Sequence, residues 1–443
     1  MVRPVIGALL LSILLGTPAM CASAPTGSAA VSSSPDVAEA QASDPAAATQ
    51  AWLATVPAEQ RAKSNAYFEG GYWLLLWNFL LTVAMSIFLL AARISARLRD
   101  FAERVTTFKA GQVAVYGIAY LLVVAMLSFP LTVYQFFFRE HRYGMATQNF
   151  GQWFGEQLIG LGLTLLVGPL LLIALYGVFR RAPRTWWIWG ATVVIAFWIV
   201  GVFLAPIYVE PLFNTYKPLE DPAVKEPILT LARANQIPVT QVFEVDASRQ
   251  TKRISANVAG FLSTTRIALN DNLLRECTLP EIREVMAHEM GHYVLNHIAK
   301  LTLDLAVAVA VVFALTRLIF EAALSRWGEK WGVRGIADPA GLPLLVLILS
   351  AFAFLLTPVS NTVVRVAERE ADAFSINTAR EPDAMAKVAL KLGAYRKLDP
   401  GPLEEFIFFD HPSGRARIRM AMDWKAANLP DSKLFTKPEA AGP

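Results

Sequence analysis

Five long apolar runs without a charged side chain constrain the fold of this chain most strongly. Each run meets the requirement of about 20 residues for a helix that crosses a membrane. The runs occupy residues 70 to 92, 110 to 138, 157 to 179, 185 to 209 and 339 to 364. Hydrophobic residues make up 55% of the 443 residues and charged residues only 17%, which is too apolar for a soluble protein of this length. The sequence therefore predicts a multi-pass membrane protein.

A sixth apolar run, residues 301 to 320, contains Asp304 and Arg317. We expect it to cross the membrane too, because Asp304 lies near one end and the long side chain of Arg317 can reach the interface. It would then form a transmembrane hairpin, residues 301 to 364, with the run that follows. The alternative is a long helix buried in a soluble domain.

The first 58 residues differ in composition from the rest of the chain. Residues 1 to 24 contain Arg3, then an apolar core and then small residues. This pattern predicts either a cleaved signal peptide or an uncleaved first transmembrane anchor. Residues 25 to 58 are mostly Ala, Ser, Pro and Thr, which predicts a disordered tether. The formal net charge of +4 gives no sign of a nucleic-acid partner, and the two cysteines, Cys21 and Cys277, provide no disulfide framework.

The segment His288-Glu289-Met290-Gly291-His292 carries the clearest chemical signal. On a helix, the two histidines lie four residues apart on one face, and Glu289 can reach a water held between them. Such a site binds Zn²⁺, which lowers the pKa of the water from about 15.7 toward about 7 so that a glutamate can take its proton. Gly291 indicates a close approach of another element. Thr278, Pro280 and Glu281 form a helix start, so we expect a helix from Leu279 to about Ile298.

The third metal ligand must come from another part of the chain. Glu368 is the strongest candidate, because Asp372 lies one turn further on and can accept an N–H from a metal-bound imidazole. Glu370 should face away, and Glu284 is the second choice. His297 points away from both motif histidines if the helix continues, so we expect it to pack or to form a hydrogen bond.

Two polar blocks, residues 210 to 299 and 365 to 443, flank the predicted hairpin. We expect them to form one zinc metallopeptidase domain, residues 210 to 443, which follows an N-terminal transmembrane domain of residues 59 to 209. Periodicity in the first block predicts a helix at Asp221 to Ala234 and strands at Gln241 to Val245, Ser255 to Leu262 and Thr265 to Leu269.

These motifs resemble those of the integral-membrane CAAX prenyl proteases, the a-factor-converting type of zinc metallopeptidase. The secretory-type leader suggests a bacterial member of that family. The resemblance rests on the residues around His288 and His292, on Asn361, Arg365, Glu368, Ala371 and Asp372, on Asp246-Ala247-Ser248 with Asn257 and Gly260, and on His411-Pro412 with Arg417. The chain departs from the family at Val364, where Ser is usual, and in a segment before Asn257 that is two residues longer than in eukaryotic members.

The resemblance implies a mainly α fold: a multi-pass transmembrane helical bundle with a zincin-like α+β zinc metallopeptidase domain. It further implies roles for individual residues. His288, His292 and Glu368 would bind one Zn²⁺, and Glu289 would be the general base. His411 and Arg417 would bind substrate or stabilise the oxyanion. Asp372, Arg365 and Asn361 would support the ligands, and Asn257 and Gly260 would hold the substrate backbone by β-addition.

The function expected from these residues is a membrane-embedded zinc metalloendopeptidase similar to CAAX proteases. Its partners would be a peptide or protein substrate, membrane-associated or free, and the lipid bilayer. One alternative is a heat-shock-type quality-control protease of membrane or envelope proteins. Another is a catalytically silent, zinc-bound membrane scaffold, which the presence of Glu289 argues against.

The charges of the loops leave the orientation open. The loops at 93 to 109, 180 to 184 and 326 to 334 are rich in Arg and Lys, and all lie on the side opposite the polar blocks. In the cell inner membrane, the positive-inside rule puts the metal site outside the cytoplasm. The family resemblance puts it inside.

Overall fold

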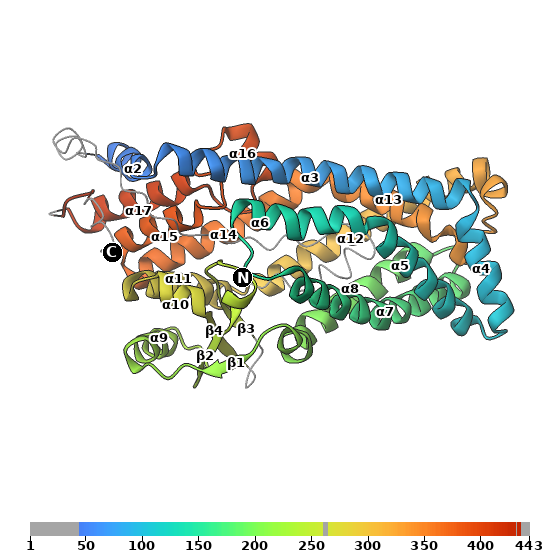
Figure 1. The fold of residues 1–443 in the computed structure, drawn as a ribbon, viewed down its shortest axis with the longest axis horizontal. Helices are drawn as coiled ribbons and strands as arrows, with labels where there is room; N and C mark the ends of the chain where they lie inside the picture. The colour runs from blue at the N-terminus through green and yellow to red at the C-terminus, as the bar shows by residue number, and fades with distance from the viewer. Residues whose placement is uncertain (1–43, 260–264, 431, 436–443) are drawn as a thin grey trace.

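The computed structural model describes residues 44–259, 265–430 and 432–435. Long helices run side by side along the long axis of the molecule, and a small sheet lies beside one end of them (Figure 1). The mainly α prediction for the fold is confirmed. The predicted leader, residues 1–24, the first part of the tether, residues 25–43, and Gly260 all lie outside the described residues.

All six apolar runs lie in long helices. Five helical segments of the described chain are each long and apolar enough to cross a membrane: α3 (Ala58–Ala91), α5 with η1 and α6 (Lys109–Tyr143), α7 (Phe150–Arg181), α8 with η2 and η3 (Trp186–Leu212), and α12 (His297–Trp331). The sixth is a bent pair, η6 and α13 (Pro339–Leu355) followed by α14 (Thr357–Ala379), with an angle of 55° between them. Pro358 in the first turn of α14 lacks the N–H that would continue the helix, which explains the break.

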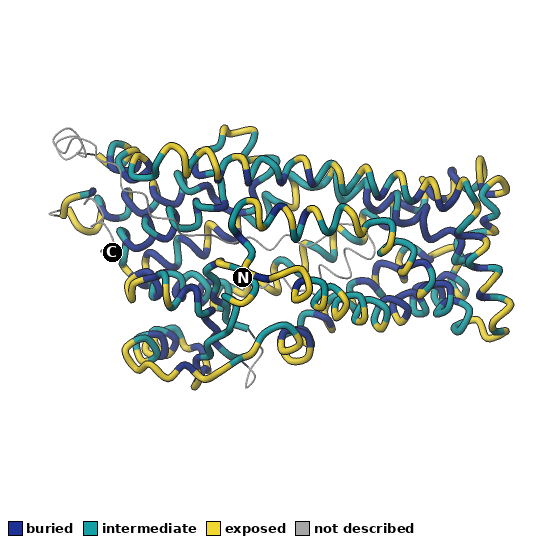
Figure 2. The backbone as a smooth tube through the Cα atoms, in the orientation of Figure 1, coloured by how far each residue is buried: buried dark blue, intermediate teal, exposed yellow. Residues whose placement is uncertain are grey.

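A short amphipathic helix, α4 (Ile94–Val105), lies across the end of the bundle opposite the sheet (Figure 1). Buried residues gather toward the two ends of the molecule (Figure 2). At the α4 end, the core includes Tyr116, Phe179, Trp186 and Leu345. The opposite end holds the sheet and the C-terminal helices.

The sheet has four strands in the order β1-β2-β4-β3. The strands are β1 (Tyr216–Pro218), β2 (Val242–Val245), β3 (Ala256–Ala259) and β4 (Arg266–Asn270). β2 and β4 are parallel, and the two outer strands are antiparallel to their neighbours. β3 therefore forms one edge of the sheet. The predicted strands are confirmed within the described residues, and β1 is an addition that the sequence pattern did not indicate.

Helices of the polar blocks complete this end of the molecule, and the first three of them pack against the sheet. They are α9 (Pro222–Ala234), α10 (Asp271–Glu276), α11 (Leu279–Val294), α15 (Pro382–Leu392), α16 (Pro402–Phe408) and α17 (Gly414–Asn428). Met286 and Met290 of α11 pack with Val242 and Ile267 of the sheet in one buried cluster. The histidine-bearing helix thus rests on the sheet through its apolar face.

The prediction of a tether is wrong for its last part. Residues Pro45–Ala54 form helix α2, which Asp44 caps and which packs against α17. Trp52 is fully buried, and its ring meets that of Phe435 edge-on at 5.3 Å. The low hydrophobicity of this segment predicted disorder. Its few apolar side chains nevertheless pack against the C-terminal region, which lies almost 400 residues further along the chain.

Candidate metal centre

Helix α11 begins and ends at clear local signals. At its start, the Glu281 carboxylate accepts hydrogen bonds from the Thr278 backbone N–H and hydroxyl, at 2.6 and 2.9 Å. Its last residue is Val294, so the predicted extension to about Ile298 is wrong. The reason is Asn296, which adopts a left-handed conformation with φ 55° and starts the new helix α12 at His297.

Helices α11 and α14 pack closely at Gly291. A Cβ atom at this position would lie 3.3 Å from the Ala371 Cα and 3.1 Å from a ring carbon of Phe374. The absence of a side chain therefore lets the two helices approach each other. This contact explains the glycine and brings α14 within reach of the motif histidines.

Three ligand atoms meet between these helices. His288, His292 and Glu368 each offer one, and all three lie within 4.8 Å of one another. The Nε2 atoms of the two histidines are 3.1 Å apart, and Glu368 Oε2 lies 3.2 Å from His288 Nε2. Zn²⁺ binds such atoms at about 2.0–2.2 Å, so two tetrahedral ligands are separated by about 3.4 Å. The spacing fits a tetrahedral metal ion.

The chemistry of the three residues also fits a cation. Glu368 is only 1% exposed, and its buried carboxylate lies 3.2 Å from His288 Nε2 and 3.6 Å from His292 Nε2. Burial works against a charge on His288, but Asp372 and Glu368 outweigh it and raise the pKa of this imidazole. Burial and the neighbouring His288 lower the pKa of His292. The buried carboxylates of Glu368 and Asp372 thus favour a positive charge beside them. A bound cation would supply this charge and leave both histidines neutral, as metal ligands must be.

Both imidazoles are held at their second nitrogen. His288 Nδ1 lies 2.9 Å from the Asp372 carboxylate, and His292 Nδ1 lies 2.9 Å from His297 Nδ1. His297 in turn meets Glu370 through Nε2 at 3.0 Å. Such contacts fix the tautomer and the direction of a ligating imidazole.

The position of His297 differs from the one that the sequence predicted. It does form a hydrogen bond, but to a motif histidine, because the turn at Asn296 brings it back toward His292. Glu370 does face away from the three ligand atoms, with 46% of its side chain exposed, yet it reaches His292 indirectly through His297. The Asn-His pair after the motif was the available signal, since Asn readily adopts a left-handed turn.

Two further residues reach the site from the C-terminal part of the chain. His411 Nε2 lies 3.2 Å from Glu368 Oε2, and its Nδ1 lies 2.8 Å from Asp410. Arg417 on α17 lies 2.9 Å from Asp372 and 3.5 Å from Glu368. Both side chains are buried.

Arg365 and Asn361 lie on α14 but contact none of the ligands directly. Arg365 donates to the carbonyl oxygens of Glu405 and Phe409, and Asn361 donates to that of Ile407 at 2.8 Å. They therefore hold the α16 segment that leads to His411, one step further from the metal than the sequence suggested.

Glu284, the second choice for the third ligand, lies elsewhere. It accepts a hydrogen bond of 2.5 Å from Ser375, and burial raises its pKa to about 7. It is not among the three clustered ligand atoms.

Strand β3 lies beside α11 and has an open outer edge among the described strands. Asn257 is on this strand, and its side-chain Oδ1 is buried with no hydrogen-bond partner in the described chain. A buried acceptor without a donor is costly in a folded protein. Within the described residues, Asn257 Oδ1 is thus an unsatisfied acceptor on the edge strand.

Comparisons with known proteins point to one family. Residues 218–425 match the model of Peptidase family M48, and residues 41–215 match that of the CAAX prenyl protease N-terminal region with five membrane helices. The uncharacterized metalloprotease YhfN of Bacillus subtilis is 29% identical over 77% of this chain and 80% of its own length. CAAX prenyl protease 1 of Saccharomyces cerevisiae is 26% identical over 68% of this chain and 69% of its own. The crystal structure of S. mikatae Ste24p has the same fold, with a TM-score of 0.71 and 20% identity, and the match covers 87% of this chain and 96% of that chain.

Proposed function

Because the chain belongs to the CAAX prenyl protease type of Peptidase family M48 and is a membrane metalloprotease, we propose that it is a zinc endopeptidase. One Zn²⁺ per chain is held by His288, His292 and Glu368. The observation that carries this proposal is the spacing of these three ligand atoms, two of which come from α11, the helix that also carries Glu289. The two family matches meet near residue 216, which supports a division into a membrane domain, 59–209, and a peptidase domain, 210–443.

In the proposed mechanism, Glu289 moves the proton. When bound, Zn²⁺ polarises the scissile carbonyl and lowers the pKa of water toward about 7. Glu289 takes a proton from the water as its oxygen attacks the carbonyl carbon, and returns it to the amine that leaves when the C–N bond breaks. Burial raises the pKa of Glu289, which makes its carboxylate a stronger base. Asp372 and His297 keep the motif histidines in fixed tautomers.

His411 and Arg417 are placed to act on the substrate carbonyl. Both side chains reach Glu368 Oε2, the carboxylate oxygen that also lies 3.2 Å from His288 Nε2. Preorganised donors of this kind stabilise the negative charge that develops on the carbonyl oxygen. We assign them to substrate binding and oxyanion stabilisation, with Asp410 holding His411 and Asp372 holding Arg417.

The two alternative functions are not favoured. The match to the CAAX-type membrane region accounts for the N-terminal half of the chain, which a heat-shock-type protease does not require. A silent scaffold does not need a glutamate directly after the first ligand. The natural substrate is a peptide or protein, and prenylated C-termini form one class to be tested because relatives are named for them.

Removal of the metal tests the function directly. The purified protein should cleave an extended reporter peptide, lose this activity after dialysis against a chelator, and regain it with about one equivalent of Zn²⁺. Cleavage that survives complete removal of the metal, as measured by metal analysis of the same sample, would contradict the proposal. Thermal unfolding of the metal-free protein provides the control that the fold is retained.

We further propose that β3 binds the substrate backbone. β3 is an edge strand among the described strands and lies beside the histidine helix, so it can pair with an extended peptide, and Asn257 Oδ1, which has no partner within the described residues, can accept one of the peptide N–H groups. Gly260 follows directly and belongs to the same proposed substrate segment.

Replacement of Asn257 by alanine should lower kcat/KM by about 5- to 150-fold, because one unsatisfied hydrogen bond costs about 1–3 kcal/mol. The zinc content should not change. Asn235→Ala is the control, since that side chain bonds only the backbone of its own helix, at Leu231. An unaltered kcat/KM, or a loss that follows a loss of zinc, would show that β3 is purely structural.

We place this integral membrane protein in the cell inner membrane with its metal site outside the cytoplasm. Support comes from one cavity at the α4 end, whose lining includes Arg99, Lys109, Arg180 and Arg334 from all three cation-rich loops. The positive-inside rule assigns that end to the cytoplasm. A C-terminal alkaline phosphatase, active only outside the cytoplasm, should therefore be active, and a C-terminal fluorescent protein that folds only inside should stay dark. The reverse pattern would establish the orientation that the family resemblance suggests.

A further inference from the structure

The end of the bundle opposite the metal centre contains a cavity with a volume of about 250 Å³. Its charged lining comprises Arg99, Glu103, Lys109, Arg180, Arg334 and Asp338. Cations thus outnumber acids, and they come from four different segments: α4, the start of α5, the end of α7, and the loop between α12 and α13.

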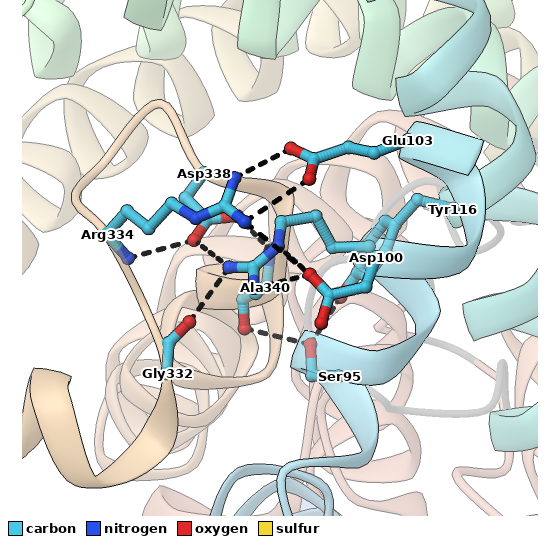
Figure 3. Close-up of polar contacts among 9 residues, drawn as sticks. Ser95, Asp100, Glu103, Tyr116, Gly332, Arg334, Asp338 and Ala340 are labelled. Carbon is cyan, nitrogen blue, oxygen red and sulfur yellow. Dashed lines mark hydrogen bonds and ion pairs between the residues drawn. The ribbon is translucent and has the colours of Figure 1, made fainter. Parts of the chain in front are cut away.

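Part of this charge is neutralised in a fixed network (Figure 3). Arg99 lies 2.6 Å from Asp338 and 2.7 Å from Asp100, and Arg334 lies 2.7 Å from Glu103. The side chains of Arg99 and Asp338 are less than 10% exposed, so this pair is a built part of the fold. The network joins α4 to the loop between α12 and α13 and makes one wall of the cavity rigid.

Ser95 adds two further contacts between α4 and the neighbouring segments. Its hydroxyl donates to the Ala340 carbonyl oxygen at 2.8 Å and lies 2.7 Å from the Tyr116 hydroxyl (Figure 3). The backbone N–H of Arg334 also donates to Asp338, at 2.8 Å. These contacts hold α4 in place against the ends of the long helices.

Two cations of the cavity, Lys109 and Arg180, lie outside this network. No acidic side chain of the described chain lies within ion-pair distance of Lys109 or Arg180, and Lys109 bonds only the neutral Gln112, at 3.1 Å. Arg180 is half-buried at the last turn of α7. Two cations that face one cavity repel each other, and an anion between them would remove this repulsion.

The surroundings of the cavity indicate which kind of anion would fit it. Phe101, Val105 and Phe108, on α4 and just after it, are 52%, 55% and 70% exposed. An amphipathic helix with exposed apolar side chains, lying across the ends of membrane helices, belongs at the boundary between acyl chains and headgroups. The cavity therefore opens at the depth of lipid phosphates, and acyl chains can cover the apolar side chains beside it.

We propose that this cavity binds the phosphate of an anionic phospholipid headgroup, with Lys109 and Arg180 as its counterions and the Arg99–Asp338 network as its rigid wall. Basic pockets between membrane helices are a known way to recognise such headgroups. The site lies at the far end of the bundle from the metal, so it is independent of the proposed catalytic role.

The test uses the full-length protein in detergent, incubated with equal amounts of phosphatidylglycerol and phosphatidylcholine, with the bound lipid counted by native mass spectrometry. Wild type should retain phosphatidylglycerol selectively. Each cation near a membrane surface contributes about fivefold, so the Lys109→Gln/Arg180→Gln double variant should lose about 25-fold in affinity. Lys109 is exposed, and Lys109→Gln alone should lose about fivefold without an effect on folding.

The matched control is Arg97→Gln/Arg184→Gln, which removes two exposed cations at the same end that do not line the cavity. It should retain phosphatidylglycerol as wild type does. Equal losses in both double variants would overturn the proposal in favour of a general attraction to a positive surface. Full displacement of the lipid by millimolar inorganic phosphate would overturn it in favour of a site for a free anion.

Discussion

Replacement of Glu289 by glutamine should slow peptide hydrolysis by about 10²- to 10⁴-fold, which is the usual contribution of a general base. Glutamine keeps the size of the side chain but cannot take a proton from water. Because His288, His292 and Glu368 are unchanged, the variant should bind as much zinc as wild type. Single-turnover cleavage of a reporter peptide and metal analysis of the same preparation measure both quantities.

Glu226→Gln serves as the control for this substitution. It makes the same chemical change on α9, where the side chain is 59% exposed and contacts only Arg233. Its turnover should equal that of wild type. If the Glu289 variant also turned over at the wild-type rate, another group would have to accept the proton, and the proposed mechanism would be wrong.

Replacement of Glu368 by alanine should abolish most zinc binding and, with it, activity. This carboxylate supplies the third ligand atom and is almost fully buried. Removal of a residue that only orients a metal ligand lowers metal affinity by roughly 10- to 100-fold. Loss of the Glu368 carboxylate, a ligand itself, should lower the affinity for zinc by more than that. Titration of the metal-free protein with zinc, followed by calorimetry, gives the affinity.

The matched control is Glu370→Ala, on the same helix and two residues away. Its side chain points toward His297 and Lys300, and His297 keeps its hydrogen bond to His292 without it. Because Glu370 supports His292 only through His297, zinc affinity should fall much less than in the Glu368 variant. Equal zinc binding by the Glu368 variant and wild type would instead assign the third ligand to Glu284, which Glu284→Ala would then have to show.

Several features of this molecule follow from short stretches of sequence. The apolar runs predicted the membrane helices, because backbone and side chains within one run decide whether it can span a bilayer. The four-residue spacing of His288 and His292 predicted that their imidazoles meet, because helical periodicity alone brings them together. Thr278 and Glu281 likewise predicted where the histidine helix begins.

Other features depended on contacts between distant segments. The sequence could rank Glu368 above Glu284, but the packing of α14 against Gly291 is what carries the Glu368 carboxylate to the two histidines. The docking of Trp52 onto the C-terminal region likewise turned a predicted tether into a helix. Neither contact is visible in the local pattern on which such predictions rest.

The sequence by itself determined the membrane helices, the paired histidines with their base, and the residue types that can hold a metal, since all of these follow from local periodicity and side-chain chemistry. Only the tertiary structure decided how His297 turns back to His292, how His411 and Arg417 reach Glu368, and how Lys109 and Arg180 come to face one cavity. The physical reason is that one left-handed residue, Asn296, ends the helix that the sequence pattern would continue, and that packing brings together side chains far apart in the chain.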